Sequence, residues 1–109
     1  MGRPVTIFTG QWADLEFEEV CKIMSEIGYD GLEIACWGDH MDVKKASEDA
    51  EYVKEKKEIL QTYNLECYAL GAHLAGQCVG ALYDPRLDNF APDEVKGDPE
   101  AIREWAVQE

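Results

Sequence analysis

Basic residues are scarce in this sequence. Among its 109 residues, Lys and Arg total 10 against 23 Asp and Glu, which gives a formal net charge of −13, and no cluster of basic residues stands out. Binding to nucleic acid or to an anionic membrane surface depends on attraction between basic side chains and phosphate, which this charge would oppose. We therefore expect no nucleic-acid partner and no membrane partner, and we interpret most acidic side chains as solvated helix faces.

Long apolar runs and paired cysteines are also missing. No stretch approaches the roughly 20 residues of a membrane-spanning helix, and the N-terminus MGRPVTIF lacks the apolar core of a signal peptide. The four cysteines, at positions 21, 36, 67 and 78, show no CxxC spacing. Free thiols suit a reducing compartment. The sequence thus predicts a cytoplasmic protein.

Motifs for common cofactors and nucleophiles are absent. The sequence contains no GxGxxG, no GxxxxGK[ST] and no GxSxG, which disfavours a dinucleotide site, a P-loop and a nucleophile elbow. The cysteines and the two histidines lack the spacing of zinc ligands. We expect no metal or other cofactor bound by this chain alone.

Apolar runs instead alternate with amphipathic stretches. The patterns predict strands over residues 5–9, 32–36 and 65–70, and helices over residues 17–27, about 49–63 and from 99 onwards. This order, with strand starts roughly 30 residues apart, is typical of parallel βαβ units. We predict an α/β fold in a single partial domain over residues 1–109.

Residues at the ends of these helices support their assignment. Asp14 is a candidate N-cap of the first helix, and Gly28 fits a left-handed residue after its last turn. Asp98 and Pro99 are typical of the start of the last helix. The apolar face of that helix consists of Ile102, Trp105 and Ala106.

The middle helix and the segment after the third strand are less regular. We expect Asn64 to end the middle helix, whose inner stripe is Ala50, Val53, Lys57 and Leu60. Residues 71–98 are interpreted as a long loop. The last helix has no C-cap signal before Glu109, so we expect a chain truncated within or at the end of that helix. Open sheet edges then favour a homo-oligomer that assembles through them.

Glu33 is the most unusual residue of the predicted strands. Strand alternation places it with Gly31 and Ala35, on the side facing away from the helices. A carboxylate is costly to bury there. Glu33 therefore either pairs with a polar group of a neighbouring strand or faces a polar cavity that holds a substrate.

Two histidines follow strand ends, where parallel α/β folds assemble their sites. His73 comes after Gly71 and Ala72, which are small enough to let a ligand approach, and is a candidate substrate ligand. His40 lies in the loop after the second strand, where it is either part of a pH-sensitive polar cluster or part of a helix-entry turn.

Two tryptophans follow the first two strands at comparable places. Trp12 and Trp37 would project over the same face of the sheet. Indoles beside polar groups suit a sugar, whose C–H faces stack on aromatic rings while its hydroxyls need hydrogen bonds. The alternative is that either ring packs in a core beneath the loops.

Four segments together resemble a known family: VTIFTGQW, FEEVCKIMSEIGYDGLEIACWGDH, KEKKEILQTYNLECYALGAHLAGQ and GDPEAIREW. They resemble the N-terminal part of the sugar phosphate isomerase/epimerase family, the xylose-isomerase-like (β/α)8 barrels. The most specific pieces are GYDGLEI at the second strand and LGAHL at the end of the third. The resemblance implies that the chain supplies the first three βα units of a barrel.

The family resemblance also implies a reaction. Members hold a divalent metal, typically Mn, Mg or Zn, and move a proton next to a carbonyl group of a sugar or sugar phosphate. We expect the metal ligands and the proton-transfer residues on later strands, so that this chain alone is inactive. Here His73, Trp12, Trp37, Glu33 and His40 would shape the substrate pocket. The alternative is a self-associating part-barrel, an interaction or folding module without catalytic activity.

Overall fold

The structure is a computed structural model that describes residues 2–109. The chain divides into two units, Met1–Gly71 and Ala72–Glu109. The assignment of residues 1–109 to one partial domain stays a prediction. Within the described residues, none of the helices has both the length and the apolar character needed to cross a bilayer.

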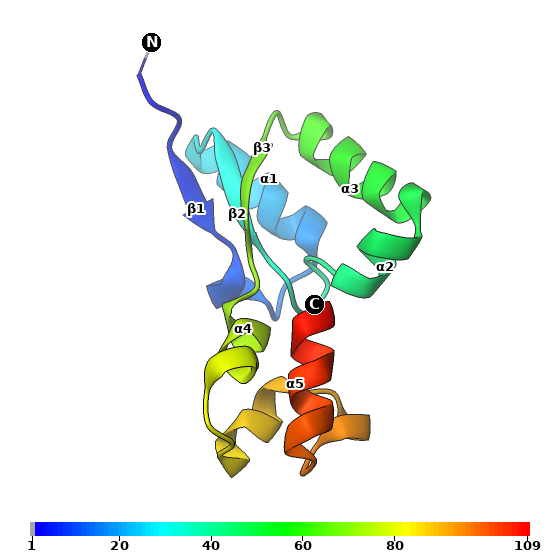
Figure 1. Cartoon of the computed structure of the whole chain (residues 1–109). Coiled ribbons are helices and arrows are strands. Elements are labelled where there is room, and N and C mark those ends of the chain that lie inside the picture. The colour runs from blue at the N-terminus through cyan, green and yellow to red at the C-terminus, as the bar shows by residue number, and fades with distance from the viewer. Residues whose placement is uncertain (1) are drawn as a thin grey trace. The chain divides into compact units, whose positions relative to one another are not determined.

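A parallel sheet organises the first unit. Its strands are β1 (Thr6–Phe8), β2 (Gly31–Ala35) and β3 (Glu66–Gly71), and they lie in the order β1-β2-β3 with parallel pairing throughout (Figure 1). The predicted α/β class and parallel sheet are therefore confirmed. The register of β2 with β3 shifts between Leu32 and Glu33, which marks a bulge.

The helices of this unit connect successive strands. A short 3₁₀ turn, η1, and α1 (Phe17–Ile27) follow β1, and α2 (Val43–Glu48) and α3 (Ala50–Thr62) follow β2. The short helix α2 was not predicted. Its N-cap is Asp42, whose carboxylate accepts a hydrogen bond from the amide of Lys45 at 3.0 Å.

The N-cap predicted for α1 was wrong. Asp14 lies in the turn after η1, and Glu16 at the N-cap position makes no side-chain capping bond. The capping group comes instead from the loop after β2, where the carboxylate of Asp39 accepts a hydrogen bond from the Phe17 amide at 2.9 Å. The C-terminal prediction was right, because Gly28 has φ 110° and its amide donates to two carbonyls of the last turn.

The predicted inner stripe of α3 is displaced by one residue at its centre. Lys57 and Ala50 are exposed, whereas Lys56 and Leu60 are buried. The Lys56 ammonium donates to the backbone carbonyl of Asp39 and lies 4.6 Å from the centre of the Phe17 ring, so polar and cation–π contacts hold it inside. The helix ends as predicted, before Asn64, which adopts a left-handed φ of 54°.

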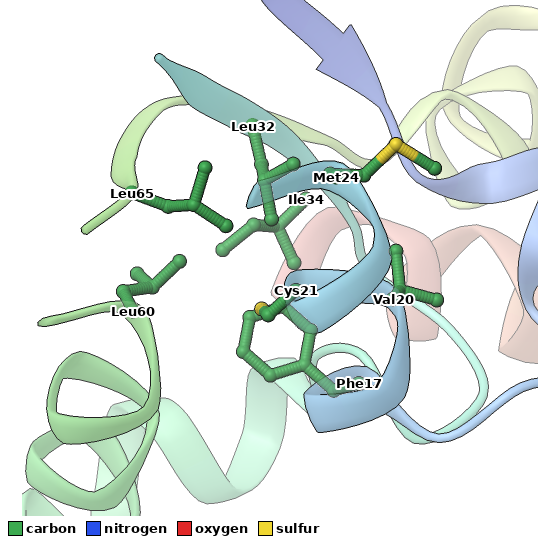
Figure 2. Close-up of a cluster of buried hydrophobic side chains, with 8 residues drawn as sticks. All are labelled: Phe17, Val20, Cys21, Met24, Leu32, Ile34, Leu60 and Leu65. Atoms are coloured by element: carbon green, nitrogen blue, oxygen red, sulfur yellow. The ribbon is translucent and has the colours of Figure 1, made fainter. Parts of the chain in front are cut away.

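The core of the first unit lies on one face of the sheet. Leu32 and Ile34 project from β2 into a cluster that contains four side chains of α1, Leu60 of α3 and Leu65 (Figure 2). The four side chains from α1 are Phe17, Val20, Cys21 and Met24. Burial of an aliphatic side chain contributes about 1.5–3 kcal/mol, so this face holds the sheet and helices together.

The second unit is helical. It contains α4 (His73–Gly80), α5 (Pro99–Gln108) and the 3₁₀ turns η2 (Pro85–Phe90) and η3 (Asp93–Val95). Its buried cluster is Cys78, Ala91, Ile102 and Ala106. The start of α5 matches the prediction, because the Asp98 carboxylate accepts from the Ala101 amide at 3.1 Å.

The prediction of an uninterrupted loop over residues 71–98 was wrong, since α4 occupies its beginning. Gly76 and Gly80 lower helix propensity in that stretch and hide the helix from pattern analysis. Only Ala75 and Cys78, three residues apart, mark its buried side.

Candidate functional site

The sheet has one face covered by α1 and α3 and an opposite face of different character. Side chains alternate along a strand, and Ile7, Leu32 and Ile34 belong to the helix-covered core. The residues between them therefore point the other way. This second side, called the open face below, carries Phe8 from β1, Gly31, Glu33 and Ala35 from β2, and Gly71 from β3.

Glu33 stands at the centre of the open face. It pairs in register with Phe8 on one side and with Ala69 on the other, and its side chain is half-buried. One carboxylate oxygen, Oε1, lies 3.1 Å from the place that a Cβ on Gly71 would occupy. Among residues 2–109, no side-chain hydrogen bond or ion pair engages this carboxylate. Of the two alternatives for Glu33, pairing with a neighbouring strand is therefore not what the described residues show.

The ring of Phe8 lies beside this carboxylate and is seated by two glycines. Its Cε1 lies 2.6 Å from the position of a Cβ on Gly71, and its other edge contacts the corresponding position on Gly10. Real Cβ atoms do not approach a ring this closely. Glycine at both positions is what lets the aromatic ring lie against the backbone.

Trp37 extends this aromatic surface at the carboxyl end of β2. Its indole meets the Phe8 ring edge to face, with centroids 5.7 Å apart and an interplanar angle of 72°. Such T-shaped pairs are favoured by the ring quadrupoles. Phe8, Glu33 and Trp37 thus form one group in the first unit, which we call the carboxylate–aromatic cluster.

The predicted site residue His40 lies elsewhere. Its imidazole is fully buried: Nδ1 is 2.8 Å from the Thr9 hydroxyl and Nε2 is 3.1 Å from the Leu15 carbonyl. Because a carbonyl can only accept, Nε2 carries the proton and Nδ1 accepts from Thr9. The Thr9 oxygen accepts in turn from the Ala35 amide at 3.0 Å. His40 therefore ties the loop after β2 to β1, and its burial gives no support to ligand contact.

Trp12 and Trp37 contact different clusters. Trp12 ends η1 and is half-buried against the helix-covered core, while Trp37 packs on Phe8. The prediction that both indoles project over one face is therefore wrong. The core-packing alternative describes Trp12.

His73 belongs to the second unit, where it is exposed and opens α4. Its backbone carbonyl accepts a hydrogen bond from the side-chain amide (Nε2) of Gln77 at 3.2 Å. Its assignment as a substrate ligand stays a prediction.

Carboxylates occupy the helix N-termini of the first unit. Asp39 caps α1, Asp42 caps α2, and Asp49 accepts from the Glu51 amide at 2.9 Å at the start of α3. These amide groups and the positive end of the helix dipole would otherwise attract an anion. At α2 the Lys45 ammonium also lies 4.0 Å from the Asp42 carboxylate. Desolvation lowers the pKa of the buried Lys56, although the Asp39 carboxylate acts to raise it.

A metal site is not assembled by the part of the chain that the structure describes. Among residues 2–109, no group of three or more His, Cys, Asp or Glu side chains could hold a metal ion. The divalent metal implied by the family resemblance thus has no ligand set among these residues and stays a prediction.

Comparison with known proteins adds no relative. Neither the models of known protein families nor the curated protein sequences contain a match to this chain. What the chain does must therefore be inferred from its own residues.

The sequence predictions missed Phe8, Gly10 and Gly71 as parts of the candidate site. A signal for them was present, because glycines directly after strand residues often mark a close approach of other groups to the backbone. The partner that approaches, here the Phe8 ring, depends on strand register and could not be known from the sequence.

Proposed function

We propose that the first unit is the beginning of a (β/α)8 barrel of the sugar phosphate isomerase/epimerase type. In this proposal the complete barrel interconverts sugars by divalent-metal-dependent proton transfer next to a carbonyl group. The carboxylate–aromatic cluster would form part of the wall of the substrate pocket.

The different character of the two sheet faces favours a barrel fold rather than a doubly wound α/β fold. Strands covered by helices on both sides are almost continuously apolar. Here β2 alternates strictly, with Leu32 and Ile34 toward the helices and Glu33 among glycine and alanine on the open face. A polar group among small residues suits a barrel interior that admits a ligand.

The half-buried carboxylate of Glu33 has no protein partner among residues 2–109 and lies beside the Phe8 ring, on which Trp37 packs, and this observation carries the functional proposal. Sugar hydroxyls can donate hydrogen bonds to such a carboxylate, and the C–H face of a sugar packs well on aromatic rings. Among residues 2–109 no unpartnered side-chain oxygen is fully buried, so the Glu33 carboxylate remains accessible to a hydroxyl group of a ligand.

The proposal assigns positioning of the sugar to this chain, and it assigns metal binding and proton transfer to further strands. Residues 2–109 bring no set of metal ligands together. Glu33 and Trp37 would bind and orient the sugar.

An activity assay tests this proposal. The complete reading frame that contains this chain should interconvert an aldose and a ketose, or epimerise a ketose, when supplied with Mn²⁺, Mg²⁺ or Co²⁺. Glu33→Gln should lower kcat/KM about 10- to 100-fold through the loss of one charged hydrogen bond. Glu66→Gln, at the amino end of β3, is the matched control and should retain activity. Absence of turnover with every metal and sugar tried would contradict the proposal.

A second candidate is a self-associating part-barrel without catalytic activity. The observation in its favour is exposed apolar surface along the outer strands, where Val5 is 59%, Tyr68 49% and Leu70 56% exposed. Unpaired strand edges favour association with another chain. Size-exclusion chromatography with light scattering tests it: a stable monomer at micromolar concentration rules it out, and a folded, metal-free oligomer without turnover favours it over the isomerase.

A further inference from the structure

We infer that the carboxylate–aromatic cluster binds a neutral sugar and discriminates against phosphorylated sugars. This inference rests on the proposed function and specifies the substrate class of the same site. It depends on the charges and hydrogen bonds around the carboxyl ends of β1 and β2.

The cluster itself carries a negative charge. Glu33 contributes a half-buried carboxylate without a protein cation beside it. A phosphate group close to this carboxylate would be repelled, and the repulsion is stronger at a half-buried site than in bulk water. A hydroxyl group, in contrast, can donate a hydrogen bond to either oxygen.

Backbone amides at the N-termini of α1 and α3, where a phosphate could bind, already donate to carboxylates. Phosphate commonly binds to free amides at the N-terminus of a helix. At α1 the Phe17 amide already donates to Asp39 at 2.9 Å, and this carboxylate would itself repel a phosphate. The amides that begin α3 donate to Asp49 in the same way.

Basic residues are not available at the carboxyl ends of β1 and β2 to bind a phosphate. The segments that follow β1 and β2, residues 9–16 and 36–42, contain no Lys or Arg. The Lys56 ammonium is buried and donates to the Asp39 carbonyl, with the Phe17 ring on another side. It is committed to holding the loop and is not presented to a ligand.

The remaining surface suits a neutral polyol. Phe8 and Trp37 supply apolar ring atoms, and Glu33 supplies hydrogen-bond acceptors beside the Phe8 ring. Together they match a sugar that presents C–H groups and hydroxyls on one side.

Paired titrations test the inference. In ¹⁵N-labelled protein, the indole N–H resonance of Trp37 is assigned by its loss in Trp37→Phe, and D-fructose and D-tagatose are each titrated against the corresponding 6-phosphate. At low ionic strength we expect the neutral sugar to shift this resonance with a Kd about tenfold lower than that of the phosphate ester. In Glu33→Gln the difference should shrink to less than about threefold, whereas Glu66→Gln should preserve it.

The outcomes separate this inference from the functional proposal. Equal or tighter binding of the phosphate esters at Trp37 would overturn the inference and leave a sugar site in place. Folded protein whose Trp37 resonance responds to no sugar of either kind would overturn the inference, and the activity assay decides the functional proposal separately. A tenfold preference that persists unchanged in Glu33→Gln would show that the Glu33 charge is not its cause, which also overturns the inference.

Discussion

The two faces of the sheet are built by different rules although they share the same strands. On the helix-covered face, Leu32 and Ile34 are almost completely buried by aliphatic and aromatic neighbours. On the open face, Glu33 keeps a carboxylate without a protein partner, and the Phe8 ring lies on bare glycine backbone. The first arrangement maximises apolar burial, and the second leaves a polar group available. Apolar burial and the unpartnered carboxylate thus lie on opposite sides of one strand.

The sharpest test of this separation compares neighbouring residues of β2. Ile34→Ala should lower the free energy of unfolding by about 3–4 kcal/mol, because it leaves a cavity in the core. Glu33→Ala should change it by less than about 1 kcal/mol, since no hydrogen bond or ion pair is lost. Urea denaturation followed by tryptophan fluorescence measures both. Similar losses in the two variants would show that the faces are not energetically distinct.

A smaller loss of stability is expected when a glycine of the open face is replaced. Gly71→Ala places a Cβ 2.6 Å from Cε1 of Phe8 and should cost about 2 kcal/mol through overpacking. Phe8→Leu in the same background should recover part of this loss. Gly76→Ala is the control: its Cβ meets nothing within 4 Å and should leave stability unchanged or raise it by up to about 1 kcal/mol. Thermal unfolding of the variants measures the differences, and a neutral Gly71→Ala would refute the close seating of Phe8.

Disruption of the hydrogen bonds between Thr9, His40 and Ala35 should lower the free energy of unfolding by a smaller amount. Thr9→Val removes the acceptor for the Ala35 amide and the donor to His40, which should cost about 1–2 kcal/mol. The Ala35 amide should also exchange its hydrogen faster. Thr6→Val, at an exposed position of β1, is the matched control. Unchanged exchange at Ala35 in Thr9→Val would contradict the network.

The smallest expected effect is a pH dependence of the free energy of unfolding that arises from groups on the helix-covered face. Burial raises the pKa of the Cys21 thiol to about 12, so above pH 9 the unfolded chain loses this proton before the folded chain does. The thiol therefore lowers stability as pH rises, by about 1 kcal/mol between pH 8 and pH 10. Lys56 acts in the opposite direction, because burial lowers its pKa below 10.5 and the folded state holds fewer protons.

Cys21→Ala isolates these two contributions. The variant should lose the alkaline decline and retain the increase caused by Lys56, so its stability should rise from pH 8 to pH 10 relative to the parent. Urea titrations at the two pH values measure this difference. An identical pH dependence of parent and variant would show that the thiol ionises normally in the folded chain.

Local patterns predicted the parts of the fold that depend on neighbouring residues. The alternation of Leu32, Glu33 and Ile34 was enough to assign β2 and its two faces, and the strand bounds agree within about one or two residues. Gly28 and Asp98 end and begin their helices as expected, because both act within one turn.

The predictions that were wrong concern features that depend on contacts between residues distant in the sequence. Asp39 caps α1 from 22 residues away, whereas Asp14 was preferred only because it is near in sequence. Lys56 is buried because Phe17 and the Asp39 carbonyl receive its ammonium, which the periodicity of α3 does not reveal. For the site, the position of Glu33 was predictable, but its lack of a protein partner and the seating of Phe8 required the register of the strands.

The capping of α1 by Asp39 has a consequence for how such chains can be recombined. The first helix depends on a carboxylate from the segment after the second strand, and the same segment receives the ammonium of Lys56 from α3. A cut between the first and second βα units would therefore leave α1 without its cap and the Lys56 ammonium without the Phe17 ring. Exchange of fragments with another protein would have to keep residues 17–56 together. The smallest exchangeable segment is therefore longer than one strand and one helix.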